Sequence, residues 1–490
     1  MKKKAKQLIS QYYINYWGVN PEKEYEVEFV DAKQFIKPDR IDLMAKLEYI
    51  DSVITGKNVE YAKELYAEHL RAFTLGTYIE AEKPEKNSLE KYLNCFNEMI
   101  RSIPKEGFDA NKSVVGVSTD GNILDGSHRT AIAIYFNLLL PIIHIERGNP
   151  NNNYLFFKKL GLREKYLDYM TYKMISYMDN VYVACLYPIA TETEKDNDIQ
   201  MILNKDCNVI YKKEVYFNFG GLHNLMIHAY GNGGVHDSWV GNEKNGFSGL
   251  IPRVKCSYSE NKKTVFYFLT SSSLENVIKT KKQIRELFPF GPDSIHITDT
   301  KDEAIILSQV VLNDNSLDVL NYGEPFKYTN FVNKISAFKN ILKQNQCDFS
   351  DYAIDSSSIL SIYGLREADD IDYLTKKDDM LPKSGVYENH STQLRYYNKS
   401  IDALIYHPDN YFFFRELKYI SIKNTEIMKK NRDEEKDKRD LTLIRNLKKR
   451  RKIAKPEPNT ISEKKKYIKR KYGDNKLFSY LLRIYRKMKL

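Results

Sequence analysis

The chain has 490 residues, 42% of them hydrophobic, which is enough for about three domains with real cores. Its five cysteines have neither disulfide nor zinc spacing, which favours a reducing cytoplasm, and no stretch approaches the roughly 20 apolar residues of a membrane-spanning helix. The net charge of +11 is uneven, because the last 50 residues carry 18 Lys and Arg against three acids, or +15, and the other 440 sum to −4. A mildly acidic body is not the composition of a nucleic-acid groove.

The first predicted domain covers residues 25–150 and follows a lead-in over residues 1–24. It contains a long, mostly helical stretch from Arg40 to Ala81. Arg40 and Lys46 lie on the first turns of this stretch, six residues apart, so they do not share a helix face well. We therefore expect both to be solvated charges.

The most informative motif of this domain begins at a turn. Asp120-Gly121 predicts a connection between two short strands, Val114 to Val117 and Ile123-Leu124. A helix is expected over Ala131 to Leu139, closed by Pro141. The backbone amides at its start favour an anion. The candidate nucleotide-binding residues are therefore Asp125, Gly126, Ser127, His128, Arg129 and Thr130. The alternative is a hairpin and a core helix with a solvated His and Arg.

Gly126, Arg129 and the alanine at 131 or 133 resemble the Gly-x-x-Arg-x-x-Ala box of the ParB/sulfiredoxin superfamily, and an apolar strand, Ile142 to Ile145, follows. The resemblance covers residues 25–150. It implies that this turn binds a nucleoside triphosphate, as in CTP-dependent partition clamps and in kinases of small molecules. Ser127-His128 stands where sulfiredoxins need a cysteine, so the resemblance does not imply sulfinic-acid repair.

Residues 151–325 predict a mixed α/β domain. Val181 to Tyr187 and Thr264 to Thr270 are strands by their β-branched and aromatic content, and Leu274 to Phe288 has the pattern of an amphipathic helix. Asp299-Thr300 is a suitable cap for a helix over Lys301 to Leu312.

This middle domain carries polar residues around a glycine-rich segment, residues 231–234. They are His223, His228, His236 and Asp237, together with Ser294, His296 and Thr298, which would share one strand face. A metal site from His236, Asp237 and His296 is conceivable, but its spacing is not diagnostic. We favour a polar substrate-binding surface, with ordinary loops as the alternative.

The third domain, residues 330–446, carries two carboxylates at strand spacing. Ser357-Ser358 begins a helical run that ends at Gly364-Leu365-Arg366. Asp370 and Asp372 then alternate with apolar residues, so they are expected on one face of a strand. Two carboxylates so close suit a divalent metal such as Mg²⁺ and phosphate oxygens. Acids that simply face water are the alternative.

These residues resemble the nucleotidyltransferase superfamily typified by DNA polymerase beta. In that family a Gly-[Gly/Ser] turn holds the triphosphate and the acids of an Asp-apolar-Asp strand hold magnesium. The resemblance assigns Ser357 and Ser358 to the turn, with Ser357 replacing the first glycine, and Asp370 and Asp372 to catalysis and metal binding. Asp402 is the candidate third acid, from a strand over residues 400–405. Residues 436–440 resemble the closing Lys-Asp-x-x-Asp helix.

Residues 447–490 form a basic tail. Residues 476–490 interleave apolar residues with Lys and Arg, which suits an anionic membrane surface, with nucleic acid or a disordered tail as alternatives.

Taken as an α/β and α+β multidomain protein, the chain is expected to be a cytoplasmic enzyme, placed by its tail at the inner face of the membrane. It would use Mg²⁺ and ATP or another nucleoside triphosphate for phosphoryl or nucleotidyl transfer to a small polar acceptor. The module combination suggests a cell-surface polysaccharide precursor as that acceptor. The alternative is a ParB-like DNA-binding or regulatory protein with a degenerate transferase domain. It predicts a helix-turn-helix after residue 150, where the sequence has no basic recognition face.

Overall fold

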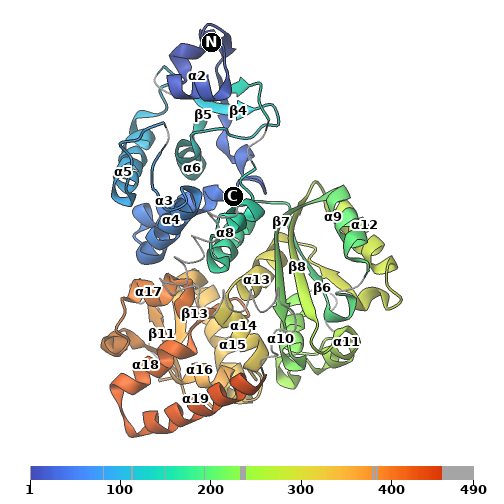
Figure 1. Ribbon diagram of the computed structural model, residues 1–490. Coiled ribbons are helices and arrows are strands. Elements are labelled where there is room, and N and C mark those ends of the chain that lie inside the picture. The colour runs from blue at the N-terminus through green and yellow to red at the C-terminus, as the bar shows by residue number, and fades with distance from the viewer. Residues whose placement is uncertain are drawn as a thin grey trace. The chain divides into compact units, whose positions relative to one another are not determined.

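The computed structural model describes residues 2–80, 82–111, 114–148, 151–191, 194–231, 239–377, 381 and 385–454. Residues 1–440 form one compact unit and residues 441–490 a second. The first unit is mixed α/β, with three larger sheets, each drawn from one of the three predicted domains (Figure 1). One large hydrophobic cluster has members from Ala32 to Phe413 and includes residues of all three regions.

The N-terminal sheet has the order β3-β5-β4. β3 pairs antiparallel with β5, and β4 pairs parallel with it. Residues 2–26 fold against this sheet, because Trp17 and Ala5 share a core with Val114 and Ile143. The elements of the region are β1 (Lys2–Lys4), α1 (Ala5–Leu8), α2 (Gln11–Trp17), β2 (Glu24–Glu26), β3 (Glu28–Asp31), α3 (Asp42–Thr55), α4 (Val59–Phe73), α5 (Leu89–Glu106), β4 (Val115–Ser118), α6 (Ser127–Phe136) and β5 (Leu139–Ile145).

The predicted first strand, turn and helix are present here with shifted bounds, but the predicted strand Ile123-Leu124 is reduced to an isolated bridge at Ile123. Gly121 takes a positive φ of 73°, and Val117 bridges Ile123 as in a short hairpin. The helix α6 begins at Ser127 and ends at Phe136, before Pro141, which lies inside β5. Asn137 ends the helix in the left-handed conformation at φ 54°, so the helix needs no proline to stop it.

The middle sheet is antiparallel throughout, with the order β7-β8-β6-β9. Helices α9 and α12 cover one face and share a core with alternate residues of β6 and β8, while α10 and α13 lie on the other face (Figure 1). The predicted strands and helices of this region are confirmed. The predicted ones are β6, β8, α12 and α13, and the elements of the region are α7 (Tyr154–Lys159), α8 (Glu164–Tyr177), β6 (Val181–Leu186), α9 (Asp196–Asp206), β7 (Cys207–Tyr216), α10 (Phe219–Tyr230), α11 (Ile251–Ser257), β8 (Lys263–Ser271), α12 (Leu274–Glu286), β9 (Ile295–Ile297), α13 (Lys301–Val311) and α14 (Asp314–Tyr322).

The C-terminal sheet has five strands in the order β12-β11-β10-β14-β13. α15 lies on the face of Tyr373, whose ring is 5.3 Å from that of Phe338, and α17 lies on the face of Lys418, which donates to the Ile405 carbonyl. The elements are α15 (Thr329–Gln344), β10 (Tyr352–Asp355), α16 (Ser357–Ile362), β11 (Ile371–Thr375), β12 (Tyr387–Asn389), α17 (Ile401–Tyr406), β13 (Tyr411–Phe414), β14 (Leu417–Ile420), α18 (Ile422–Arg432) and α19 (Glu435–Ala454).

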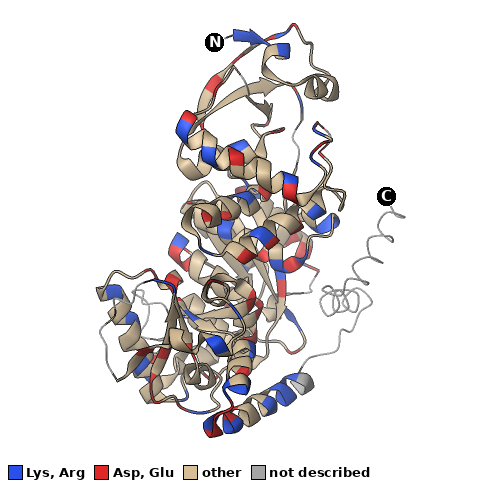
Figure 2. Cartoon of the chain, turned by 90° about the vertical axis from the view of Figure 1, so that its left-hand side faces the viewer, with Lys and Arg blue, Asp and Glu red and all other residues tan. Residues whose placement is uncertain are grey.

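Charges of both signs are mixed along the helices of the first unit (Figure 2). In α19 the acids are confined to the N-terminal turns, up to Asp440, and the later charged residues are basic. The amphipathic pattern at residues 476–490 lies outside the described residues. Within the described part, no helix combines the length and apolar character that crossing a bilayer requires.

Candidate functional site

The Asp125–Arg129 turn closes on itself. Asp125 is buried, accepts from the Gly116 amide at 2.9 Å and pairs with the Arg129 guanidinium at 3.0 Å. Arg129 also donates to the Val114 carbonyl at 3.1 Å. Gly126 is required at φ +71°, because a Cβ there would come within 2.8 Å of Arg129 and of Val115. The Arg129 side chain therefore holds β4 and the turn together.

His128 points into the core between α4 and α5. Its Nε2 lies 2.8 Å from the Tyr66 hydroxyl, and its ring is 4.6 Å from that of Phe96. Burial lowers the pKa of His128 well below its usual value, so the imidazole is neutral. Ser127 is the first residue of α6, and the Thr130 hydroxyl donates to the Gly126 carbonyl. Phosphate binding at this turn stays a prediction.

The expectation that Arg40 and Lys46 are solvated is wrong, since they are only 3% and 2% exposed. Asp42 lies between them: Arg40 donates to both of its carboxylate oxygens, and Lys46 Nζ lies 3.1 Å from Oδ2. Burial alone would raise the pKa of Asp42, but the two cations outweigh it and hold that pKa well below its usual range. The spacing of Arg40 and Lys46 did not predict this trio, because the two cations meet through the acid between them in the chain, Asp42.

His69 on α4 lies close to this trio. It is 2% exposed, and neither ring nitrogen has a partner within the described residues. Burial, and after it the charge of Lys46, keep the pKa of His69 well below its usual value. Lys46 and His69 also lower the pKa of His128. The interior of the N-terminal region thus gathers Arg40, Lys46 and two imidazoles around one carboxylate.

The C-terminal sheet holds a second cluster, which we call the acid cluster: Asp355, Asp370, Asp372 and His390. Asp355 ends β10 and is the cross-strand partner of Asp372 on β11. His390 lies between them, with Nδ1 3.3 Å from Asp355 and Nε2 3.6 Å from Asp372. The Tyr397 hydroxyl donates to the other oxygen of Asp355. Asp355 was not predicted from the sequence, although an acid at the end of an apolar strand, just before Ser356, could have indicated it.

Burial and neighbouring charges of both signs set the pKa values in the acid cluster. Burial raises the pKa of Asp372 to about 6, and Asp370 and Asp355 add to this rise against the opposing effect of His390. Burial alone would lower the pKa of His390, but Asp355 and Asp372 outweigh it and raise that pKa. The two carboxylates therefore favour the protonated form of His390, whose charge opposes theirs.

The backbone at Ser356 has a conformation that normally belongs to glycine, with φ 58° and ψ −123°. The glycine-like position of this turn is therefore Ser356, and its assignment to Ser357 is corrected by one residue. Ser357 and Ser358 begin α16 as predicted. Both are buried, and the Ser358 hydroxyl has no hydrogen-bond partner within the described part of the chain.

Asp402 does not belong to the acid cluster, so its predicted role as the third acid on a strand is corrected. It lies in the first turn of the helix α17, which Ser400 caps. Its two oxygens accept from the Asn58 and Val59 amides at 3.1 and 3.0 Å, and Lys376 pairs with it at 2.9 Å. Asp402 therefore caps α4 and ties the N-terminal region to the C-terminal sheet.

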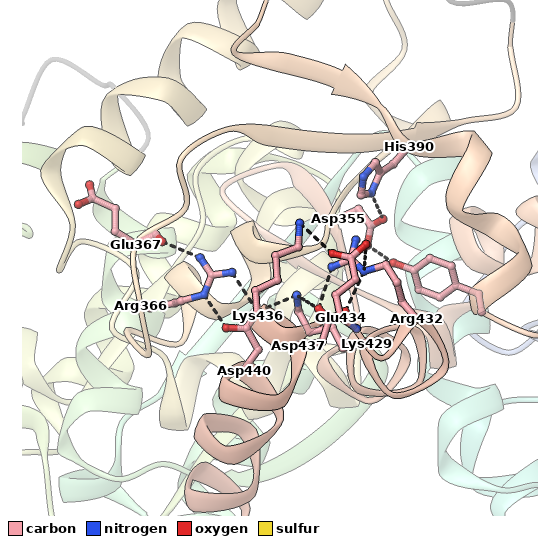
Figure 3. A network of polar contacts seen from close by, with 11 residues as sticks. Asp355, Arg366, Glu367, His390, Lys429, Arg432, Glu434, Lys436, Asp437 and Asp440 are labelled. Atoms are coloured by element: carbon pink, nitrogen blue, oxygen red, sulfur yellow. Dashed lines mark hydrogen bonds and ion pairs between the residues drawn. The ribbon is translucent and has the colours of Figure 1, made fainter.

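The predicted Lys-Asp-x-x-Asp segment is helical and anchors the end of the first unit. Arg366 makes two hydrogen bonds to Asp440, at 2.6 and 2.9 Å, so Asp440 is its direct partner, while the charges of Asp369 and Asp370 also raise its pKa. Lys429 and Arg432 on α18 pair with the buried Asp437 at 3.3 and 2.8 Å (Figure 3). Lys436 is exposed and pairs with Glu434.

The predicted polar residues of the middle region are dispersed. His236 and Asp237 lie outside the described residues. His223 contacts the Phe247 carbonyl at 3.2 Å, and His228 is buried beside Phe414. His296 lies on β9 and is 6% exposed. No three His, Cys, Asp or Glu side chains of the described residues are grouped so that they could hold a metal ion.

Comparison with known proteins adds no assignment. No protein-family model, no curated protein and no solved structure matches this chain.

Proposed function

We propose that the protein is a nucleotide-dependent enzyme that transfers a phosphoryl or nucleotidyl group to a small polar acceptor, with its transfer site at Asp370 and Asp372. The observation that carries the proposal is the acid cluster. Asp355 and Asp372 are cross-strand partners beside the Ser356 turn, and the pKa of Asp372 is raised to about 6 by burial and by the neighbouring acids Asp370 and Asp355. An oxygen-rich site with surplus negative charge calls for a cation.

The donor set suits a hard cation such as Mg²⁺. Asp370 is partly exposed and Asp372 is nearly buried, so the pair offers carboxylate oxygens at the edge of the sheet. Bound there, Mg²⁺ would neutralise charge on the phosphate oxygens of a nucleotide. Asp355 and His390 would fix the orientation of Asp372, because His390 contacts both acids.

The ParB-like DNA-binding alternative has less support. It needs an exposed helix after residue 150, but α8 packs against α3 and α13 and buries residues on several sides. A helix held between two others offers little surface to a DNA groove. This packing favours the enzyme.

The test is a panel of ATP, CTP, GTP and UTP with and without Mg²⁺, measured by thermal shift and by nucleotide turnover. At least one nucleotide should raise the melting temperature in a Mg²⁺-dependent way. Asp370→Asn should lower Mg²⁺-dependent turnover by roughly 100-fold or more. It should also raise the melting temperature in metal-free buffer, because repulsion with Asp372 is removed.

The matched control is Asp369→Asn, which changes the adjacent exposed acid. It should leave turnover within about two-fold of wild type, as expected for a surface change away from the reacting groups. Unchanged turnover in a folded Asp370→Asn protein, or no response to any nucleotide, would contradict the proposal.

A further inference from the structure

The middle region holds a group of donors that the proposed transfer site does not use. We call it the cationic cluster: Arg253, Lys281, Arg285 and His296, grouped around Tyr230. Arg253 comes from α11, Lys281 and Arg285 from α12, and His296 from the edge strand β9. The pKa of His296 lies well below its usual value. Burial is the main cause, and the charges of Lys281, Arg253 and Arg285 lower it further.

Tyr230 organises one side of the cluster. Its ring centre is 4.7 Å from that of His296, and the Arg253 guanidinium lies over it at 4.9 Å. The Tyr230 hydroxyl is 3.1 Å from that of Tyr187, and Arg253 Nη2 donates to the Pro292 carbonyl at 2.7 Å. The guanidinium of Arg253 and the imidazole of His296 therefore both contact the Tyr230 ring.

The two cations of α12 are fixed by the edge strand. Lys281 Nζ donates to the Ile297 carbonyl at 2.8 Å, and Arg285 Nη2 donates to the Ile295 carbonyl at 3.3 Å. The two carbonyls flank His296 in the chain. Because Lys281 and Arg285 lie one helical turn apart, they share a helix face, and both heads are held on the same side of β9.

Several donors of this cluster lack partners. Arg253 Nε, Arg285 Nε and His296 Nε2 are buried and accept or donate no hydrogen bond within the described residues. The acids nearby are Asp299, which pairs with Lys281 at 3.1 Å and is half exposed, and Asp293, which acts on Arg253. A buried donor without an acceptor costs free energy, and native proteins satisfy nearly all of them with a ligand or water.

We propose that the cationic cluster binds the phosphate group of a small phosphorylated molecule. A phosphate offers oxygens in several directions, which suits two guanidinium groups, an ammonium and an imidazole converging from three elements. Trp239, whose ring centre is 5.9 Å from that of Tyr230 and which is 44% exposed, gives the rest of the molecule an aromatic surface. The proposal stands on these residues alone and does not depend on transfer at Asp370 and Asp372.

The test is isothermal titration of the full chain in EDTA, so that no divalent cation supports binding at the acid cluster. The probes are inorganic phosphate, glucose 6-phosphate and AMP, with glucose and acetate as uncharged and carboxylate controls. At least one phosphate compound should bind saturably and shift the His296 ring signals in NMR spectra. Phosphate binding as tightly as both esters would identify free phosphate as the ligand, and tighter ester binding would identify a phosphorylated molecule.

Two variants locate the binding. Arg253→Gln and His296→Gln should each weaken phosphate affinity by about ten-fold or more, as the loss of one charge-assisted bond predicts. Arg101→Gln, which changes an exposed arginine on α5, should leave it unchanged. If Arg253→Gln does not fold, His296→Gln decides. Equal affinity in all variants, weak non-saturable binding, or tighter binding of acetate than of phosphate would overturn the proposal.

Discussion

The N-terminal and C-terminal sheets of the protein both bury charged side chains beside a strand, a turn and a helix, but they balance those charges differently. In the N-terminal region each buried acid has a cation: Asp125 pairs with Arg129, and Asp42 with Arg40 and Lys46. In the C-terminal sheet two buried acids face each other around one imidazole. Lys418, on the same face, donates to the carbonyls of Ser350 and Ile405.

The turns differ in the same way. The N-terminal turn places a glycine, Gly126, at its positive φ, so the backbone is relaxed. The C-terminal turn places Ser356 in a region of φ and ψ that is almost confined to glycine. Closed ion pairs and a relaxed turn serve structure, whereas surplus charge and local strain tend to mark sites that work on a ligand. The comparison therefore favours the C-terminal turn as the site of chemistry.

The largest effect is expected from a substitution that breaks the charge balance of the N-terminal region. Asp42→Asn should lower the free energy of unfolding by about 3–5 kcal/mol, because the buried Arg40 and Lys46 then lose the carboxylate with which both pair. Urea unfolding followed by circular dichroism measures this. Glu90→Gln on the exposed face of α5 is the matched control and should change stability by less than about 0.5 kcal/mol.

A triple variant tests whether the trio itself stabilises the fold. Replacing Arg40, Asp42 and Lys46 together by Met, Leu and Met should restore most of the loss, since whole buried ion groups can often be exchanged for apolar residues. A single Asp42→Asn variant as stable as wild type would show that the three charges are not buried as a group.

Sequence patterns were informative where local chemistry decides the structure. Residues 114–145 and 355–372 follow the predicted orders of strand, turn and helix, because turn residues and apolar periodicity act over a few positions. Contacts between distant segments were not accessible. Asp402 was expected beside Asp370 but caps α4, some 340 residues earlier in the chain, because tertiary packing chose its partner.

In the candidate sites, too, some residues could be predicted from their spacing and others are brought in only by the fold. Asp370 and Asp372 could be found from their spacing, but Asp355 and His390 join them only through strand pairing and the fold of residues 390–396. Of the cationic cluster, the sequence singled out His296, as one member of a predicted polar substrate-binding surface around residues 231–234. The cations of the cluster come from α11 and α12, and neither helix has a sequence pattern that points at β9.

The next prediction concerns the buried cation of the C-terminal sheet. Burial lowers the pKa of Lys418 from its ordinary 10.5 to about 7, although Asp351 opposes the shift. Between pH 7 and about 10 the unfolded chain therefore binds more protons at this residue than the folded one does, so stability from this group rises with pH. Below pH 7 both forms are protonated and the cost of burial is fully present.

Lys418→Met removes this dependence. The unfolding free energy of wild type minus that of Lys418→Met should rise by about 2–4 kcal/mol between pH 7 and pH 10, measured by urea unfolding at each pH. Lys423→Met, on the exposed side of α18, should give a flat difference. A flat difference for Lys418→Met as well would show that this lysine keeps an ordinary pKa and is solvated in the native protein.

The smallest expected effect compares Ser356 with Gly126. Ser356→Gly should raise the unfolding free energy by about 1 kcal/mol, because glycine adopts φ 58° and ψ −123° without the strain that a Cβ brings. Ser357→Gly, one residue later and inside α16, should lower it by about 0.5–1 kcal/mol, because glycine disfavours a helix. Thermal unfolding of both variants in metal-free buffer measures this pair of opposite signs. Two losses of similar size would mean that Ser356 is not strained, and the contrast between the two turns would then rest on charge alone.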